Sequence, residues 1–165
     1  KHHPGPKRGI VGVAVAGAVA RPAVAARQAR QAGIVAKLVS LAVGEALFYG
    51  GVLGCREGRS TDSWVDFDFF GHQLSLHLGE PFRTTDTGRV GDEMVPMPHL
   101  GLVLQRDDWQ ALAKRLTDAG TAFVLEPQLR FAGQPGEQWT MFFRDPSGNP
   151  IEVKGFASLQ TLYDA

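Results

Sequence analysis

Cysteine is almost absent from this chain, because Cys55 is the only one among its 165 residues. A single thiol excludes an intramolecular disulfide and a zinc cage built from cysteines, and it suits the reducing cytoplasm, which we predict as the location. Cys55 follows Leu53 and Gly54 at an expected strand start, so we interpret it as a small buried apolar residue. Long apolar runs are also missing, since none approaches the ~20 residues that span a bilayer.

A net charge is lacking too, because 17 Lys and Arg residues balance 17 Asp and Glu residues. This balance predicts no nucleic acid or other polyanion as partner. Acidic and aromatic residues are both absent from 1–44, which is Ala-rich and basic and imitates a secretory signal or a transit peptide. We favour the alternative that 1–33 is an N-terminal extension, basic and either disordered or artefactual.

From residue 34 onward, strand and helix patterns follow each other regularly. The patterns predict strands at 34–41, 55–58, 64–70, 72–78, 99–104, 122–126, 139–144 and 150–156, and helices at 42–52 and from Asp107 to Ala119. Residues 79–98 lack periodicity and are interpreted as a linker or a long loop. Strand–helix–strand–strand–strand therefore occurs twice, at about 34–78 and 99–156. This order predicts an α+β domain over 34–165, made of two paired βαβββ modules whose sheets form a curved cup.

A carboxylate and two imidazoles lie on the predicted strands. Glu152 stands between Ile151 and Val153, and because strand neighbours face opposite sides, its side chain must meet water, a cation or a metal. His99 begins the first strand of the second module, and His77 lies on a polar strand face in the first. Two imidazoles and one carboxylate can form a facial triad for Fe(II) or another divalent metal. A solvated sheet face is the alternative for Glu152 and for His77.

Two stretches resemble signatures of the vicinal-oxygen-chelate superfamily, which includes glyoxalase I, extradiol dioxygenases, fosfomycin-resistance enzymes and bleomycin-binding proteins. Residues 47–54 (LFYGGVLG) resemble its helix-to-strand signature, and 143–152 (FRDPSGNPIE) resemble the hairpin whose Glu is a metal ligand. His99 stands where the second module supplies a His ligand, and the whole resemblance covers about 43–156. Residues 71–73 and 130–137 further resemble a dioxygenase-like branch of small bacterial members.

The resemblance implies a metal site with His99 and Glu152 as two ligands and His77 as the third. The family usually places another His near position 34, where this chain has Ile34. Either that ligand is absent, or the amino-acid sequence of 1–42 is altered, for example by a wrong reading frame.

The same resemblance implies a divalent metal, Fe(II) favoured over Mn, Zn or Ni, that chelates two oxygens of a small-molecule substrate. A dioxygenase-like enzyme is favoured; a glyoxalase-like lyase or isomerase and a non-catalytic, antibiotic-sequestering binding protein stay open as alternatives. Arg130, Gln134 and Glu137 are expected to bind substrate at the mouth of the cup, with an ordinary polar loop as the alternative. Members of the family often dimerise, so a homodimer is also open.

Overall fold

The computed structural model describes residues 44–61, 64–77 and 83–162. The predicted extension at 1–33 and the predicted strand at 34–41 lie outside these ranges. No helix within them is long and apolar enough to cross a membrane. In chain order the elements are η1 (Leu47–Val52), β1 (Arg56–Ser60), β2 (Trp64–Phe69), β3 (His72–His77), β4 (Thr85–Val90), β5 (Glu93–Met97), β6 (Leu100–Gln105), α3 (Arg106–Asp118), β7 (Phe123–Arg130), β8 (Gln138–Arg144), β9 (Pro150–Phe156) and η2 (Leu159–Thr161).

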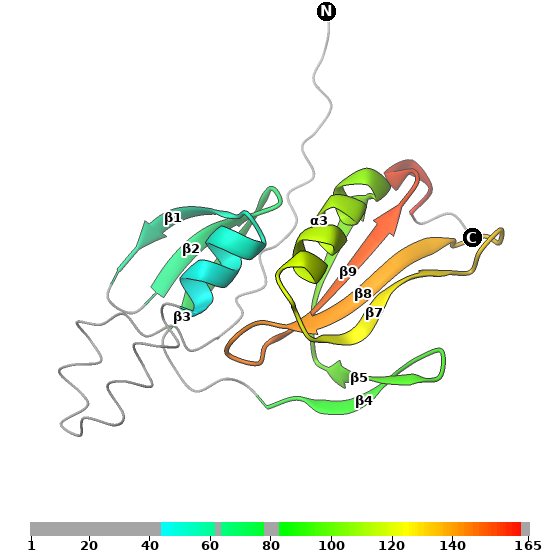
Figure 1. Cartoon of the computed structure of the whole chain (residues 1–165), viewed down its shortest axis with the longest axis horizontal. Coiled ribbons are helices and arrows are strands. Elements are labelled where there is room, and N and C mark those ends of the chain that lie inside the picture. Colours follow the sequence, from blue (N-terminus) through cyan, green and yellow to red (C-terminus); the bar gives the residue numbers. More distant parts are fainter. Residues whose placement is uncertain (1–43, 62–63, 78–82, 163–165) are drawn as a thin grey trace, which may run out of the picture.

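The second module is complete and has the predicted βαβββ order. Its sheet runs β6-β9-β8-β7, with β6 parallel to β9 and the other two pairs antiparallel (Figure 1). Helix α3 covers one face, because its buried stripe of Trp109, Leu112 and Leu116 faces the sheet. The indole Nε1 of Trp109 donates to the Val153 carbonyl at 2.9 Å, which fixes the helix on β9. The predicted α+β fold is confirmed.

The first module contributes helix η1 and the antiparallel sheet β1-β2-β3. Residues 44–46 are α-helical, and η1 continues them as a π-helical turn, in which Leu53 N–H donates to the Phe48 carbonyl at 2.8 Å. Gly71 lies in the turn between the two strands predicted at 64–70 and 72–78. Phe69 pairs with His72, and the two residues between them both have positive φ, which is the geometry of a type I′ hairpin turn.

The two modules share one hydrophobic core. Side chains from η1, β2 and β3 belong to the same buried cluster as those from β6, α3, β8 and β9. Arg115 on α3 donates to the Leu53 carbonyl at 3.0 Å, and the rings of Phe48 and Phe143 meet edge to face. Within the described ranges, no strand of β1–β3 is hydrogen-bonded to a strand of β6–β9, so side chains rather than a continuous sheet join the modules.

The loop predicted over 79–98 is wrong for its larger part. Strands β4 and β5 form a hairpin with Thr85 opposite Met97, and Val95 packs on Leu125 and Phe142 of the second sheet. The hairpin escapes a periodicity search because β4 has no buried residue and β5 has only two, Val95 and Pro96. An exposed strand gives no alternation of apolar and polar residues.

Two predicted boundaries also shift. The strand expected to end before Pro127 continues to Arg130, because β7 is an edge strand with an irregular register between Leu125 and Gln128, where proline is tolerated. Helix α3 begins at Arg106, one residue before the predicted start at Asp107, and has Gln105 as its N-cap. Gly120 has the positive φ of 70° expected just after a helix end.

Candidate metal centre

Glu152 occupies the middle of the second sheet. Strand β9 lies between β6 and β8, and its Ile151 and Val153 belong to the core shared with α3. Because side chains alternate along a strand, Glu152 points to the opposite face, where only 8% of it is exposed. A carboxylate this buried needs a cation or hydrogen-bond donors beside it.

His99 supplies the nearest imidazole. It directly precedes β6, whose parallel pairing sets Gly101 beside Glu152, and its Nε2 lies 3.4 Å from Glu152 Oε2. Phe142, opposite Glu152 on β8, meets the His99 ring edge to face at 4.7 Å between centroids. The fold thus brings together His99 and Glu152, two of the three predicted metal ligands.

The other nitrogen of His99 is bound by the hairpin. His99 Nδ1 lies 3.0 Å from the carbonyl oxygen of Pro96, which can only accept, so Nδ1 carries a proton. In the neutral ring the Nε2 lone pair therefore faces the Glu152 carboxylate. Two acceptors at this distance require a proton or a cation between them, and a backbone carbonyl behind an imidazole is the usual support of a metal-ligating His.

Lys154 also approaches the carboxylate, and the sequence reasoning missed it. Its Nζ lies 3.4 Å from the same Oε2 of Glu152, and its side chain is 35% exposed. The signal was available, because a residue two positions along a strand shares the face of Glu152. The site therefore holds a carboxylate with an imidazole and an ammonium group beside it.

The pair His99 and Glu152 fits one metal ion. Protein ligands bind zinc-like ions at about 2.0–2.2 Å, so two donor atoms 3.4 Å apart would subtend about 110° at the ion, near the tetrahedral angle. Among residues 44–61, 64–77 and 83–162, no three His, Cys, Asp or Glu side chains are grouped for a metal. His77 lies exposed at the end of β3 in the other sheet, so within one chain it does not join the pair.

The three predicted substrate-binding residues lie on or beside the β7–β8 loop. Arg130 ends β7 opposite Gln138, and its guanidinium lies over the Phe131 ring at 4.8 Å. Glu137 Oε2 accepts from the Gly133 N–H at 2.7 Å, and Gln134 makes backbone hydrogen bonds within the loop. These contacts hold the loop to itself, and in the described part of the chain no hydrogen bond or ion pair joins its side chains to His99 or Glu152.

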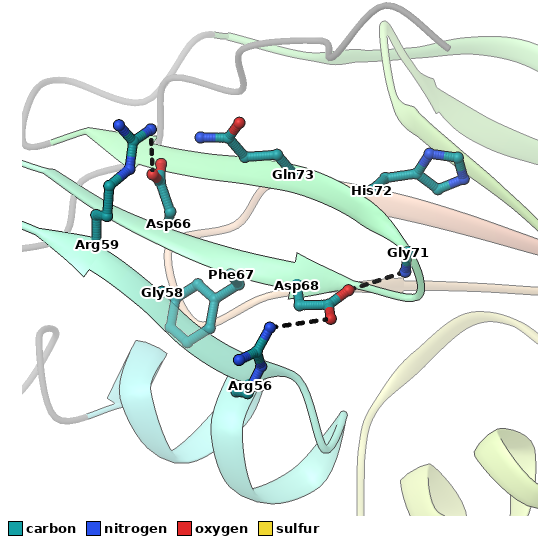
Figure 2. A pocket seen from close by; sticks show the side chains of 9 residues that line it. All are labelled: Arg56, Gly58, Arg59, Asp66, Phe67, Asp68, Gly71, His72 and Gln73. Atoms are coloured by element: carbon teal, nitrogen blue, oxygen red, sulfur yellow. Dashed lines mark hydrogen bonds and ion pairs between the residues drawn. The ribbon is translucent and has the colours of Figure 1, made fainter. Parts of the chain in front are cut away.

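A polar hollow of about 420 Å³ lies on the first sheet (Figure 2). Its charges are paired: Arg59 donates to Asp66 at 3.1 Å, and Arg56 lies 3.9 Å from Asp68. A hydrogen bond from the Ser75 hydroxyl, together with the Arg59 contact, holds the pKa of Asp66 below its ordinary value. His72 also lines this hollow, which is a solvated groove with balanced charge rather than a site that demands an ion.

A second polar cluster joins the modules. The Tyr49 hydroxyl donates to Asp145 at 2.9 Å, and Asp145 also accepts from the backbone and side-chain N–H groups of Asn149. Glu45 is 1% exposed, and in the described part neither of its oxygens has a partner at hydrogen-bond geometry. Burial is the largest cause that raises the pKa of Glu45, and the charge of Asp145 is the second. Ser147 lowers the pKa by a smaller amount, and the resulting value is about 7.

Cys55 behaves as its sequence context predicts. Its side chain is buried, and burial raises the pKa of the thiol to about 11. A thiol with so high a pKa is almost entirely protonated at neutral pH, and the thiolate is the reactive form. Cys55 is therefore a core residue and not a nucleophile.

Comparison with known proteins now identifies the family. The model of the Glyoxalase/Bleomycin resistance protein/Dioxygenase superfamily matches residues 46–153, so the chain belongs to this superfamily. A glyoxalase/bleomycin resistance protein/dioxygenase from Alicyclobacillus acidocaldarius is 30% identical, with a TM-score of 0.57 over 73% of this chain and 87% of its own. No curated protein matches the chain.

Two more distant structures have the same fold. An integron cassette protein from the Halifax Harbour sewage outfall metagenome is 17% identical, with a TM-score of 0.55 over 91% of this chain and all of its own. A glyoxalase/dioxygenase from Nostoc punctiforme is 16% identical, with a TM-score of 0.50 over 68% of this chain and 82% of its own. Members of the superfamily generally use divalent metal ions and bind small molecules.

Proposed function

We propose that this chain is a metal-dependent enzyme of the glyoxalase/extradiol dioxygenase type, with His99 and Glu152 as two ligands of the metal. The observation that carries the proposal is the 3.4 Å approach of His99 Nε2 to Glu152 Oε2. His99 directly precedes β6 and Glu152 lies on β9, two strands that are distant in sequence and adjacent in the sheet. A divalent ion, Fe(II) favoured over Mn, Zn or Ni, would act there as a Lewis acid toward two chelating oxygens of a small substrate.

The chain's own residues would prepare this site in three ways. The Pro96 carbonyl holds the proton of His99 on Nδ1 and leaves Nε2 free to bind. Phe142 packs on the imidazole and restricts its rotation. The sheet buries Glu152 almost completely, which limits the water that competes for its carboxylate.

His77 stays our prediction for the third ligand, and it would have to come from a second copy of the chain, because it does not join the pair within one copy. A homodimer is therefore part of the proposal. Arg130, Gln134 and Glu137 stay predicted substrate-binding residues at the rim. The single cysteine supports a cytoplasmic location, and the balanced charge supports a small-molecule partner rather than a nucleic acid.

Metal content tests the proposal. The protein is purified without chelator, and iron, manganese, zinc and nickel are measured in the wild type, in His99→Ala and in Glu152→Ala. We expect stoichiometric metal in the wild type and its loss in both variants, whereas the control His72→Ala, which changes a histidine outside the pair, keeps it. A wild-type protein that is free of metal and binds none on titration would refute the proposal.

A non-catalytic binding protein is the second candidate, and one observation favours it. The ammonium group of Lys154 already lies beside the Glu152 carboxylate. Among the described residues only His99 and Glu152, and no third metal-ligating side chain, lie together. A metal-free protein of native stability that binds small antibiotics would support this alternative. Oxygen uptake with catechol-type substrates separates a dioxygenase from a glyoxalase-like lyase or isomerase, which consumes no O₂.

A further inference from the structure

An imidazole nitrogen and an ammonium group converge on one carboxylate oxygen at the proposed metal site. His99 Nε2 and Lys154 Nζ each lie 3.4 Å from Oε2 of Glu152. A carboxylate oxygen that is already next to an ammonium group is less available to a metal. Resting on the metal site proposed above, we propose that Lys154 is a resident counter-cation that lowers the affinity of this site for divalent metals.

The fold leaves Lys154 no other acidic partner among the described residues. Across the sheet it lies opposite Thr140 on β8 and Val103 on β6, which are both uncharged. Because side chains alternate along a strand, Lys154 lies on the same face of the sheet as Glu152, which is its only ion-pair partner among the described residues. Its ammonium group replaces part of the positive charge that a metal ion would bring.

The size of the competition follows from the distances. A metal about 2.2 Å from Oε2 would lie at most about 5.6 Å from an ammonium group that stays 3.4 Å from the same oxygen. Even with the dielectric constant of water, repulsion between a dication and a unit charge at this separation lowers affinity about tenfold. Because the side chain is 35% exposed, Lys154 can instead turn outward, but it then gives up its ion pair with Glu152.

A simple structural brace predicts a different result. If Lys154 only stabilised the buried charge of Glu152, its neighbour on β9, its removal would change the stability of the metal-free protein and leave metal affinity as it was. If Lys154 competes with the metal, its removal strengthens metal binding. Metal affinity therefore separates the two roles, and it is measured without any assay of activity.

The experiment titrates metal-stripped protein with Mn²⁺ and Zn²⁺ in a calorimeter. Lys154→Met keeps the length of the side chain and removes its charge, and Lys154→Gln is a second neutral variant should the first fold poorly. Lys154→Arg retains the charge. Lys114→Met removes the same charge from the exposed face of α3, where Lys114 pairs with Asp118, and serves as the matched control.

We expect both neutral variants at position 154 to bind metal at least about tenfold more tightly than the wild type, with Lys154→Arg and Lys114→Met unchanged. Binding detectable only in the neutral variants would support the competition by Lys154 and would refute the proposed metal-dependent function of the wild type. Equal or weaker binding in the neutral variants overturns it and leaves the metal site intact. Absence of binding in the wild type and in every variant overturns both this inference and the proposed function.

Discussion

The hydroxyl of Tyr49 donates a 2.9 Å hydrogen bond to the carboxylate of Asp145, and this buried contact ties the helix of the first module to the β8–β9 turn of the second. Both residues belong to the segments whose sequences resemble the superfamily signatures. The two signatures therefore meet in space, and one of their contacts joins the modules.

Tyr49→Phe removes this hydrogen bond while it keeps the ring in the core. Asp145 still accepts from Asn149, but its oxygen Oδ2 loses one of two donors. We expect the free energy of unfolding to fall by about 2 kcal/mol, as for a buried hydrogen bond to a charged group. Urea unfolding measures it, and a double-mutant cycle with Asp145→Asn should give a coupling energy; strictly additive single effects would contradict the contact.

Glu45, which belongs to the same polar cluster between the modules, makes the free energy of unfolding depend on pH. Its pKa is about 7 in the folded protein and 4.5 in an unfolded chain, so the folded state binds the proton more tightly. Proton binding at Glu45 therefore contributes to the free energy of unfolding. This contribution is fully present below pH 4.5 and is lost as pH rises to about 7, a change of up to about 3 kcal/mol.

Glu45→Gln removes the charge and should be more stable than the wild type at pH 8 by up to about 3 kcal/mol, with the gap falling below about 1 kcal/mol at pH 5. Denaturant unfolding at the two pH values measures the gap. Glu93→Gln, which changes an exposed carboxylate side chain on β5, is the matched control. A constant gap for Glu45→Gln would mean that Glu45 titrates normally.

Much of the second module could be predicted from sequence, and the reason is local. Turn-forming residues at 145–149 separate two apolar runs, and the strand predicted at 150–156 has the bounds of β9. The β4–β5 hairpin could not be predicted in the same way, because its stability comes from packing on another sheet rather than from its own pattern.

The candidate site could be predicted only for residues whose positions follow from strand alternation and strand pairing. Strand alternation and the parallel pairing of β6 with β9 bring His99 to Glu152. Whether His77 joins them depends on how the two sheets, or two copies of the chain, are placed relative to one another. The periodicity of the sequence carries no information on that placement. The same alternation places Lys154 beside Glu152, but an ammonium group is not a metal ligand, so a pattern of metal-ligating residue types does not include it.

The hairpin should control the site through Val95 and Pro96. Val95 is buried against Leu125 and Phe142, and the next carbonyl, that of Pro96, accepts from His99. Arg144 contacts β4, the other strand of the hairpin: its guanidinium donates to the hydroxyl of Thr84, just before β4, and pairs with the carboxylate of Asp86. Loss of the Val95 contacts should therefore loosen the support of His99.

Val95→Ala and the matched variant Val65→Ala in β2 remove the same two methyl groups from buried positions. We expect each to lower the free energy of unfolding by about 2 kcal/mol. Only Val95→Ala should also weaken Mn²⁺ binding, by about tenfold, as is typical when the support of a ligand is lost. Equal metal affinity of the two variants would show that the hairpin does not position His99.

Two glycines on neighbouring strands should respond oppositely to alanine. A Cβ on Gly155 of β9 would lie 2.7 Å from both Cβ and Cγ of Trp109, whereas a Cβ on Gly101 of β6 would meet nothing within 4 Å. Trp109 cannot withdraw without breaking its hydrogen bond to Val153, so Gly155→Ala should lower the free energy of unfolding by about 1–3 kcal/mol. Gly101→Ala should be neutral or stabilising by up to about 1 kcal/mol, because it restricts the unfolded chain. Denaturant midpoints compare the two variants, and a Gly155→Ala protein as stable as Gly101→Ala would mean that α3 does not pack on β9 at Gly155.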